Sequence, residues 1–131
     1  TKYGIELYYC REQILMAARD AEIQALDTVF SDIKDMDTFK DEVTKSRDMG
    51  FDGKSCIHPK QVSVVHSIYT PTDKQIAKAV KVLDAFTASL TDNKGVLNVD
   101  GKMIDKPIVV RAQRVIDQAV AAGVNIEEKR A

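Results

Sequence analysis

The sequence has no excess of charge, no long apolar run and few cysteines. Its 131 residues carry 19 Lys and Arg against 20 Asp and Glu, a net charge of −1. A dedicated nucleic-acid-binding protein or a polybasic membrane-surface protein would show a strong basic excess, so both classes are excluded. No apolar run approaches the roughly 20 residues that a membrane-spanning helix needs, which also excludes a spanning protein.

Cysteines and targeting signals are equally sparse. Cys10 and Cys56 are the only cysteines and form neither a CxxC pair nor a Cys/His cluster. We therefore expect reduced thiols in a cytoplasmic protein rather than a disulfide framework. The sequence opens at Thr1 without an initiator Met, signal peptide or transit-like segment, so we expect a processed N-terminus or a truncated piece of a longer protein.

The sequence does contain a regular series of helical and strand patterns. Apolar residues spaced mostly by three and four predict a helix over residues 5–20, whose apolar stripe is formed by Leu7, Tyr8, Cys10, Ile14, Leu15 and Ala18. The other expected elements are a strand over 25–30, a helix capped by Asp35 or Asp37 that ends at Gly50, a strand over 53–57, a helix from Pro59, a helix over 70–90, a turn over 92–95, a hairpin of 96–99 with 102–104 around Asp100-Gly101, and a helix from Asp105 to about 122.

This order of elements indicates an α/β protein. Two strands, each followed by a helix, are typical of βα units in a parallel sheet. Parallel sheets are buried on both faces, and two parallel strands do not form a stable sheet alone. We therefore expect that further strands of the sheet are missing from this chain.

Candidate site residues follow the two strands. Functional groups in parallel α/β folds gather at the carboxyl ends of strands, here the loops 31–35 and 57–59. Asp32 is a candidate for a site at the mouth of the sheet, whereas Asp35 is expected to cap a helix. His58 is a candidate general base or a contact for an acyl or phosphate group; the alternative is that it shapes the turn before Pro59.

Three residues outside these loops can each be interpreted as functional or as structural. Asp105 could present a carboxyl group as acid or base at the corner between hairpin and helix, but N-capping before Pro107 explains an Asp there by itself. Lys54 and Lys102 are candidate phosphate contacts or ordinary solvated lysines. The sequence contains no P-loop, GxGxxG, HExxH or GxSxG motif that would assign a reaction.

Five segments match the pattern of one enzyme family. They are residues 4–7 (GIEL), 24–32 (QALDTVFSD), 50–61 (GFDGKSCIHPKQ), 69–72 (YTPT) and 100–107 (DGKMIDKP). Together they resemble the citryl-thioester lyases, the family of citrate lyase β subunits, and the resemblance extends over essentially the whole chain.

The resemblance implies a fold. The family forms a (β/α)₈ TIM barrel with a C-terminal extension, and such barrels need about 250 residues. The chain would supply a partial barrel, its last two βα units, over residues 1–69 and a helix–hairpin–helix extension over residues 70–131, and would be helix-rich as an isolated fragment. The Mg²⁺-binding Glu and Asp of the family lie upstream, so no metal ligand is assigned here.

The resemblance also implies an activity for the intact protein. A citryl thioester, carried on coenzyme A or on the phosphopantetheine of an acyl carrier protein, is cleaved to oxaloacetate and an acetyl thioester. The Met-Ile-Asp signature gives Asp105 an acid–base role in a neighbouring subunit's site. By the same resemblance, the loop after the last strand places Ile57, His58 and Pro59 near the thioester arm. His58 stands where citrate lyase β subunits often have Asn. This difference leaves open that the substrate is a free coenzyme A thioester rather than the carrier-protein form.

The expected partners are further copies of the chain and the α and γ subunits of citrate lyase, γ being the acyl carrier. The chain alone is expected to be inactive because the metal site is absent. The alternatives are a related malyl- or hydroxyacyl-thioester lyase and a non-catalytic module for oligomerisation or thioester contact.

Overall fold

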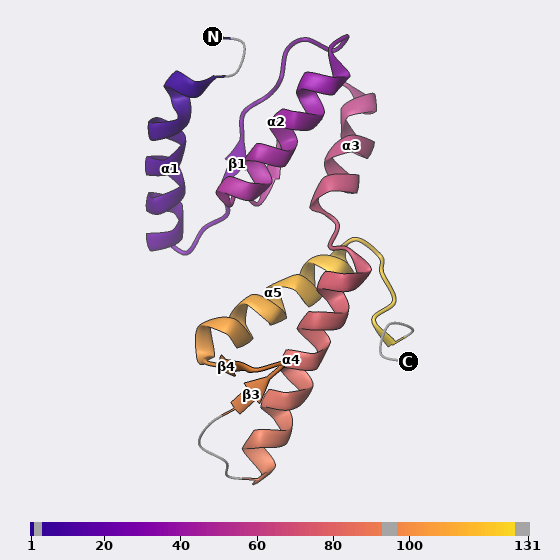
Figure 1. Ribbon diagram of the computed structural model, residues 1–131. Coiled ribbons are helices and arrows are strands. Elements are labelled where there is room, and N and C mark those ends of the chain that lie inside the picture. The colour runs from indigo at the N-terminus through magenta and orange to yellow at the C-terminus, as the bar shows by residue number, and fades with distance from the viewer. Residues whose placement is uncertain (2–3, 93–96, 128–131) are drawn as a thin grey trace. The chain divides into compact units, whose positions relative to one another are not determined.

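The computed structural model describes residue 1 and residues 4–92 and 97–127, which form mostly helices with a few short strands. The chain divides into two compact units, Thr1–Tyr69 and Thr70–Ala131 (Figure 1). None of the helices in the described part of the chain combines the length and the apolar character needed to cross a bilayer.

The Thr1–Tyr69 unit alternates helices with two very short strands. In order it contains η1 (Ile5–Leu7), α1 (Tyr8–Asp20), β1 (Leu26–Asp27), α2 (Met36–Met49), β2 (Gly53–Lys54) and α3 (Pro59–Tyr69). β1 and β2 pair in parallel, with Leu26 opposite Gly53 and Asp27 opposite Lys54. The expected parallel pairing is confirmed, but each strand is shorter than predicted because its ladder ends where the chain turns into the loop that follows.

Local signals set the ends of α2. The carboxylate of Asp35 accepts hydrogen bonds from the backbone N–H of Thr38 at 3.1 Å and from its hydroxyl at 2.7 Å. This is an N-cap, so Asp35 rather than Asp37 begins the helix. Gly50 ends the helix at a φ of 110°, a left-handed conformation that favours glycine.

The buried face of α1 differs from the predicted stripe. Leu7, Cys10 and Ile14 are exposed, and the buried residues of the helix are Arg11, Leu15 and Ala18. The prediction was wrong on the three exposed positions because it counted apolar side chains alone and could not foresee that a buried carboxylate, described below, would draw Arg11 inwards.

Two apolar clusters stabilise this unit. One joins α1 to the segments before each strand through Leu15, Ala18, Ala25 and Phe51. The other joins α2 to α3 through Phe39, Val43 and Val65, with Phe30 packed against it. Phe39 and Val43 are fully buried.

The Thr70–Ala131 unit is a helix pair joined by a hairpin. It contains α4 (Asp73–Asp92), β3 (Leu97–Val99), β4 (Lys102–Ile104) and α5 (Lys106–Ala121), with β3 and β4 antiparallel. Asp100 and Gly101 have φ of 52° and 76°, the positive values that a two-residue hairpin turn needs. The hairpin is confirmed over its described residues; Val96 and most of the predicted turn at 92–95 lie outside them.

Candidate functional site

The loops after β1 and β2 lie at the same edge of the strand pair. Both strands run in the same direction, so their carboxyl ends meet there. The backbone N–H of Ser55 donates to the carbonyl of Asp27 at 3.0 Å and continues the contact past the ladder. This edge therefore brings Asp32 and the segment Ile57–His58–Pro59 to one side of the Thr1–Tyr69 unit.

Gln61 connects these two loops, and sequence reasoning missed it. Its side-chain oxygen accepts hydrogen bonds from the backbone N–H groups of Ile57 at 2.9 Å and His58 at 3.3 Å. Its side-chain nitrogen donates to the carbonyl of Phe30 at 3.0 Å. Gln61 is fully buried. The signal that could have found it was a Gln on the inward face of α3, four residues before the buried Val65.

His58 lies at the start of α3, half-buried, and has a local role there. Its ring Nδ1 accepts a hydrogen bond from the backbone N–H of Lys60 at 3.2 Å. The turn-shaping reading of His58 is therefore visible in the structure, and the other ring nitrogen, Nε2, is left for a further contact. Ile57 beside it is 53% exposed.

Asp32 lies in the loop after β1 and is exposed. One of its carboxylate oxygens accepts a hydrogen bond from the backbone N–H of Lys34 at 3.0 Å, which makes a local turn. Its backbone carbonyl accepts a further bond from Asp35. The exposed carboxylate is available at the same edge as Ile57 and His58.

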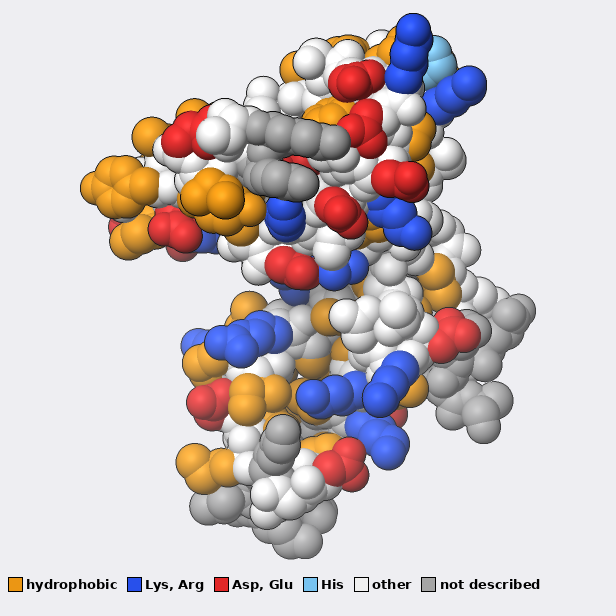
Figure 2. All heavy atoms as spheres, turned by 45° about the horizontal axis from the view of Figure 1, so that its top comes forward, with side chains coloured by type: hydrophobic (Ala, Val, Ile, Leu, Met, Phe, Trp, Pro, Cys, Tyr) orange, Lys and Arg blue, Asp and Glu red, His pale blue; other side chains and the backbone are white. Residues whose placement is uncertain are grey.

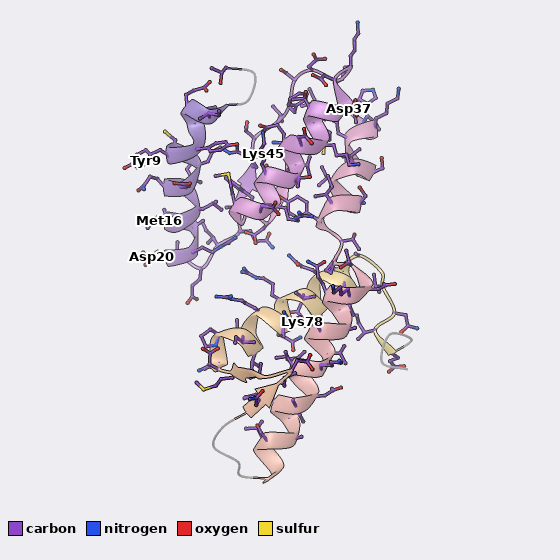
Figure 3. The ribbon with its side chains drawn as sticks, viewed as in Figure 1. Tyr9, Met16, Asp20, Asp37, Lys45 and Lys78 are labelled. Atoms are coloured by element: carbon purple, nitrogen blue, oxygen red, sulfur yellow. The ribbon has the colours of Figure 1, made fainter. Side chains whose placement is uncertain are left out.

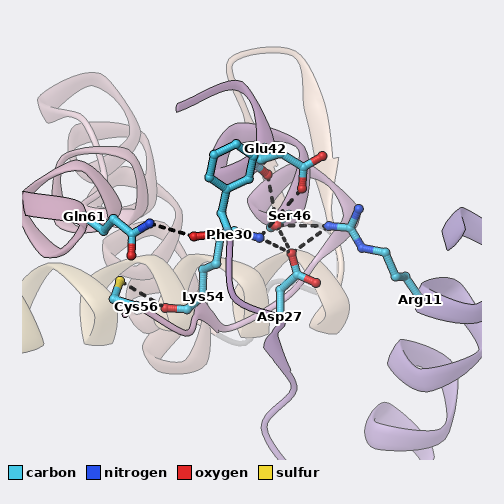
Figure 4. Close-up of polar contacts among 8 residues, drawn as sticks. All are labelled: Arg11, Asp27, Phe30, Glu42, Ser46, Lys54, Cys56 and Gln61. Carbon is cyan, nitrogen blue, oxygen red and sulfur yellow. Dashed lines mark hydrogen bonds and ion pairs between the residues drawn. The ribbon is translucent and has the colours of Figure 1, made fainter. Parts of the chain in front are cut away.

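A buried charged cluster stands on the helix-facing side of the strands (Figure 4). One oxygen of Asp27 accepts hydrogen bonds from Arg11 at 2.7 Å, from Lys54 at 2.9 Å and from the hydroxyl of Ser46. Lys54 also lies 3.7 Å from Glu42. The guanidinium of Arg11 stands 5.6 Å from the centres of two aromatic rings, those of Tyr8 and Phe51.

The electrostatics of this cluster keep Asp27 ionised. Burial by itself raises the pKa of Asp27, but hydrogen bonds from Lys54 and Ser46 and the nearby positive charges outweigh burial, so the pKa lies below its ordinary value. Because Lys54 is only 7% exposed and is held by carboxylates, it is not placed as a phosphate contact. The side chain of Lys102, the other lysine considered, lies outside the described part of the chain.

A tyrosine close to this cluster is also perturbed. Burial, together with the negative charges of Asp27 and Asp52, raises the pKa of Tyr69 to about 12. Its hydroxyl is buried without a hydrogen-bond partner among the described residues. Tyr69 therefore stays neutral at ordinary pH, because these effects outweigh the nearby positive charges of Arg47 and Arg11.

Asp105 stands in the other unit, between β4 and α5. Its side chain is exposed and accepts a hydrogen bond from the backbone N–H of Ile108 at 3.0 Å, with Pro107 in the first turn. The capping expected from the sequence is confirmed. An exposed carboxylate can cap a helix and still exchange a proton, so the cap does not decide whether Asp105 takes part in chemistry.

The same unit has a groove of about 550 Å³ between α4, the hairpin and α5. Its walls are mostly apolar, and the side chains of Lys78, Arg111 and Asp100 also line it. Ile104 and Ile108 belong to the lining, whereas Asp105 between them does not. The groove combines an apolar surface with two cations.

The described residues do not form a metal site of their own. In that part of the chain no group of three or more His, Cys, Asp and Glu side chains is arranged to hold a metal ion. The carboxylates of Asp32 and Asp105 stand in different units, and each is already engaged in a local turn or cap.

Comparisons with a family model and with individual known proteins point to the same family. Residues 1–59 match the model of the HpcH/HpaI aldolase/citrate lyase family. The chain is 41% identical over 124 residues to the citrate lyase subunit beta of Escherichia coli K12, covering 95% of this chain and 41% of that protein. It is 44% identical to the citrate lyase subunit beta of Leuconostoc mesenteroides subsp. cremoris over 118 residues, covering 90% of this chain and 39% of the relative.

A solved structure is similar in sequence and in fold. It is the protein CitE from Mycobacterium tuberculosis in complex with magnesium, acetoacetate and coenzyme A, with a TM-score of 0.68 and 33% identity. The match covers 86% of this chain and 40% of that one. The chain thus spans about two fifths of the length of the proteins it matches.

Proposed function

We propose that this chain, which belongs to the HpcH/HpaI aldolase/citrate lyase family, is part of a citrate lyase β subunit, a carbon–carbon lyase that cleaves a citryl thioester. The observation that carries the proposal is the 41% identity to a citrate lyase subunit beta over 95% of the chain. The activity belongs to the complete gene product, since the chain spans only 41% of that relative.

The proposed reaction is a retro-aldol cleavage. A base removes the proton of the tertiary hydroxyl of the citryl group, the C–C bond to the thioester-bearing CH₂ breaks, and its electron pair becomes the enolate of the acetyl thioester. The former hydroxyl carbon becomes the ketone of oxaloacetate. The enolate carbon then takes up a proton to give the acetyl thioester, which requires an acid near that carbon.

In this proposal Ile57, His58 and Pro59 contact the thioester arm, either coenzyme A or a phosphopantetheine. The support is their place at the carboxyl edge of the strands, where ligands of parallel α/β folds bind. Ile57 offers an exposed apolar surface, and the Nε2 atom of His58 has no hydrogen-bond partner among the described residues. Asp32 lies at the same edge, and we assign it to the mouth of the substrate site.

We assign proton transfer to Asp105, acting in the site of a neighbouring subunit. Its exposed carboxylate projects at the corner between β4 and α5, where the cap holds the side chain in one orientation. This role requires a homo-oligomer, which we propose together with α and γ citrate lyase subunits as further partners. The proposed location is the cytoplasm, and both cysteines are free thiols.

We further propose that the Thr1–Tyr69 unit forms the last two βα units of a (β/α)₈ barrel and that the Thr70–Ala131 unit is its extension. On β1, Asp27 is 3% exposed under the helices, whereas Leu26 on the opposite face is 63% exposed. Parallel sheets are covered on both faces, so an apolar side chain on the open face fits the interior of a barrel.

Apolar side chains on α1 support the same proposal. Figure 2 shows hydrophobic groups gathered at the surface over this helix, and Figure 3 shows Tyr9 and Met16 along its outer side, pointing away from α2. Tyr9 is 70% exposed and Met16 66%. A helix in a complete barrel would bury such side chains against its neighbours.

Magnesium has no ligand set among the described residues, so no step of the reaction is assigned to it here. The CitE structure holds magnesium and coenzyme A. We propose that the complete protein uses Mg²⁺ through residues outside this sequence.

The test is thioester turnover by the complete gene product that carries this sequence. Citryl-coenzyme A and citryl-acyl carrier protein are supplied with Mg²⁺, and oxaloacetate formation is followed; a chelator is added in a parallel assay. We expect oxaloacetate only with Mg²⁺ present. If only malyl or another hydroxyacyl thioester were turned over, the protein would be the related lyase instead. If no thioester were turned over, the remaining alternative would be the non-catalytic module.

A further inference from the structure

We propose that Gln61 is the positioning residue of the thioester-arm loop, Ile57–His58–Pro59, and that this loop binds the uncharged pantetheine part of the arm rather than a phosphate. The inference rests on the proposed function, which assigns the loop to the arm. Gln61 itself faces no ligand, since its side chain is fully buried.

The first argument is the way the hydrogen bonds of Gln61 are distributed. Its single side-chain oxygen has two lone pairs, and these accept from the consecutive N–H groups of Ile57 and His58. Its backbone N–H donates to the carbonyl of His58 at 2.9 Å. One residue therefore closes the turn through both its backbone and its side chain.

The second argument is the link to the other loop. The side-chain nitrogen of Gln61 donates to the carbonyl of Phe30, 31 residues away in the sequence. Phe30 packs on Phe39 of α2, with ring centres 5.7 Å apart. The loop after β2 is thus fixed against the loop after β1, in which Asp32 follows Phe30 by two residues.

These bonds also determine what the loop can offer a ligand. The N–H groups of Ile57 and His58 are directed at Gln61, so they do not form the anion-binding nest that a phosphate needs. The N–H of Lys60, in the first turn of α3, donates to His58 Nδ1. Within the loop itself, what remains is the exposed side chains of Ile57 and Pro59 and the Nε2 atom of His58, which in the neutral ring is the N–H donor. An apolar surface beside one donor suits the methylenes and amide carbonyls of pantetheine.

The chemistry of Gln61 is specific to an amide. An ionised Glu at this position keeps an oxygen that accepts from Ile57 and His58, but it replaces the donor to Phe30 by a buried negative oxygen that the Phe30 carbonyl repels. Met has a similar length and loses all three side-chain bonds. Comparing the two variants distinguishes the two roles of Gln61, which are to close the turn through Ile57 and His58 and to link the two loops through Phe30.

The experiment compares Gln61→Met and Gln61→Glu with the wild type in the complete gene product. Gln13→Met is the matched control, because Gln13 is exposed on α1. The dissociation constants of free coenzyme A and of pantetheine are measured by calorimetry, together with kcat and KM for the citryl thioester. We expect Gln61→Met to weaken coenzyme A binding about tenfold and to raise KM with little change in kcat, since the proposal assigns the loop to the thioester arm and not to the reacting atoms.

Gln61→Glu is expected to weaken coenzyme A binding less than Gln61→Met does, and Gln13→Met is expected to have no effect. Pantetheine binding should fall by the same factor as coenzyme A binding. A loss confined to coenzyme A would mean that the loop holds a phosphate, and this result would overturn the assignment to pantetheine.

The outcomes separate this inference from the proposed function. Turnover with unchanged coenzyme A affinity and KM in Gln61→Met would overturn the role of Gln61 and leave the lyase assignment standing. If Gln61→Met weakened coenzyme A binding but the wild type did not turn over the citryl thioester, only the lyase assignment would be overturned. If the wild type neither bound coenzyme A nor turned over the citryl thioester, both the role of Gln61 and the lyase assignment would be overturned.

Amide hydrogen exchange in the wild type tests the geometry even where a variant does not fold. The N–H protons of Ile57 and His58 should exchange slowly because both are bonded to a buried oxygen. Exchange as fast as that of exposed loop amides would overturn the inference.

Discussion

The ammonium group of Lys54 lies 2.9 Å from a carboxylate oxygen of Asp27, and the two residues stand opposite each other on β2 and β1. Asp27 is 3% exposed and Lys54 7%, so both charges are removed from water. Arg11 and Ser46 complete the hydrogen bonding of the same carboxylate oxygen. The pair therefore links the two strands at the place where α1 and α2 cover them.

Removing the carboxylate of this pair should destabilise the fold strongly. In Asp27→Asn the positive charges of Lys54 and Arg11 stay buried without a full counter-charge. We expect the free energy of unfolding to fall by about 3–5 kcal/mol. Urea unfolding followed by circular dichroism at pH 7 measures the change.

Asp48→Asn is the matched control. Asp48 forms an ion pair with Arg47 at 2.8 Å, but its side chain is 63% exposed. Solvent screens such a pair, so the substitution should cost about 0–1 kcal/mol. Equal losses in the two variants would show that the Asp27 cluster adds nothing beyond a surface ion pair.

The same cluster predicts a loss of stability in acid. The pKa of folded Asp27 lies below that of an unfolded Asp, which is about 3.9. Its contribution is therefore complete above the unfolded value and is lost as the pH falls through the folded pKa. Urea midpoints measured from pH 6 downwards should decline more steeply in the wild type than in Asp27→Asn. Parallel curves would contradict a lowered pKa at this residue.

Asp105→Asn should separate capping from catalysis in the complete gene product. Asn caps helices about as well as Asp, so the free energy of unfolding should change by less than about 0.5 kcal/mol. Loss of a proton-transfer group should lower kcat by about 100-fold or more. The control is Asp35→Asn, which alters the N-cap of α2. If Asp105→Asn turned over the citryl thioester at the wild-type rate, Asp105 would be a helix cap only.

Mixed oligomers test whether Asp105 serves a neighbouring subunit. Asp105→Asn and Gln61→Met are co-expressed in equal amounts and assayed at low thioester concentration. If each site takes its loop from one subunit and its carboxylate from the next, about a quarter of the sites combine two unaltered groups. Activity should then recover to about that fraction of the wild type. Activity no higher than the mean of the two single variants would place both groups in one subunit.

Features whose partners are close in the chain could be predicted. The cap of α2 joins Asp35 to Thr38, and the cap of α5 joins Asp105 to Ile108. The hairpin turn needs only the positive φ that Asp100 and Gly101 adopt readily. Parallel βα units follow from the order of strands and helices. For the two caps and the hairpin turn, one short segment contains all the interacting groups, whereas the parallel pairing joins strands 27 residues apart and followed from the regular alternation of strands and helices.

The burial of Arg11, Lys54 and Gln61 depends on the tertiary structure. Each has a hydrogen-bond partner far along the chain, at 16, 27 and 31 residues respectively, and a long polar side chain is ordinarily expected in water. The apolar stripe assigned to α1 was wrong at Leu7, Cys10 and Ile14 for this reason, since Arg11, which is paired with Asp27, lies on the buried face beside Leu15 and Ala18. Local sequence was sufficient to place the loops that could carry chemistry, whereas only the folding of distant segments against one another decided which polar groups hold those loops in place.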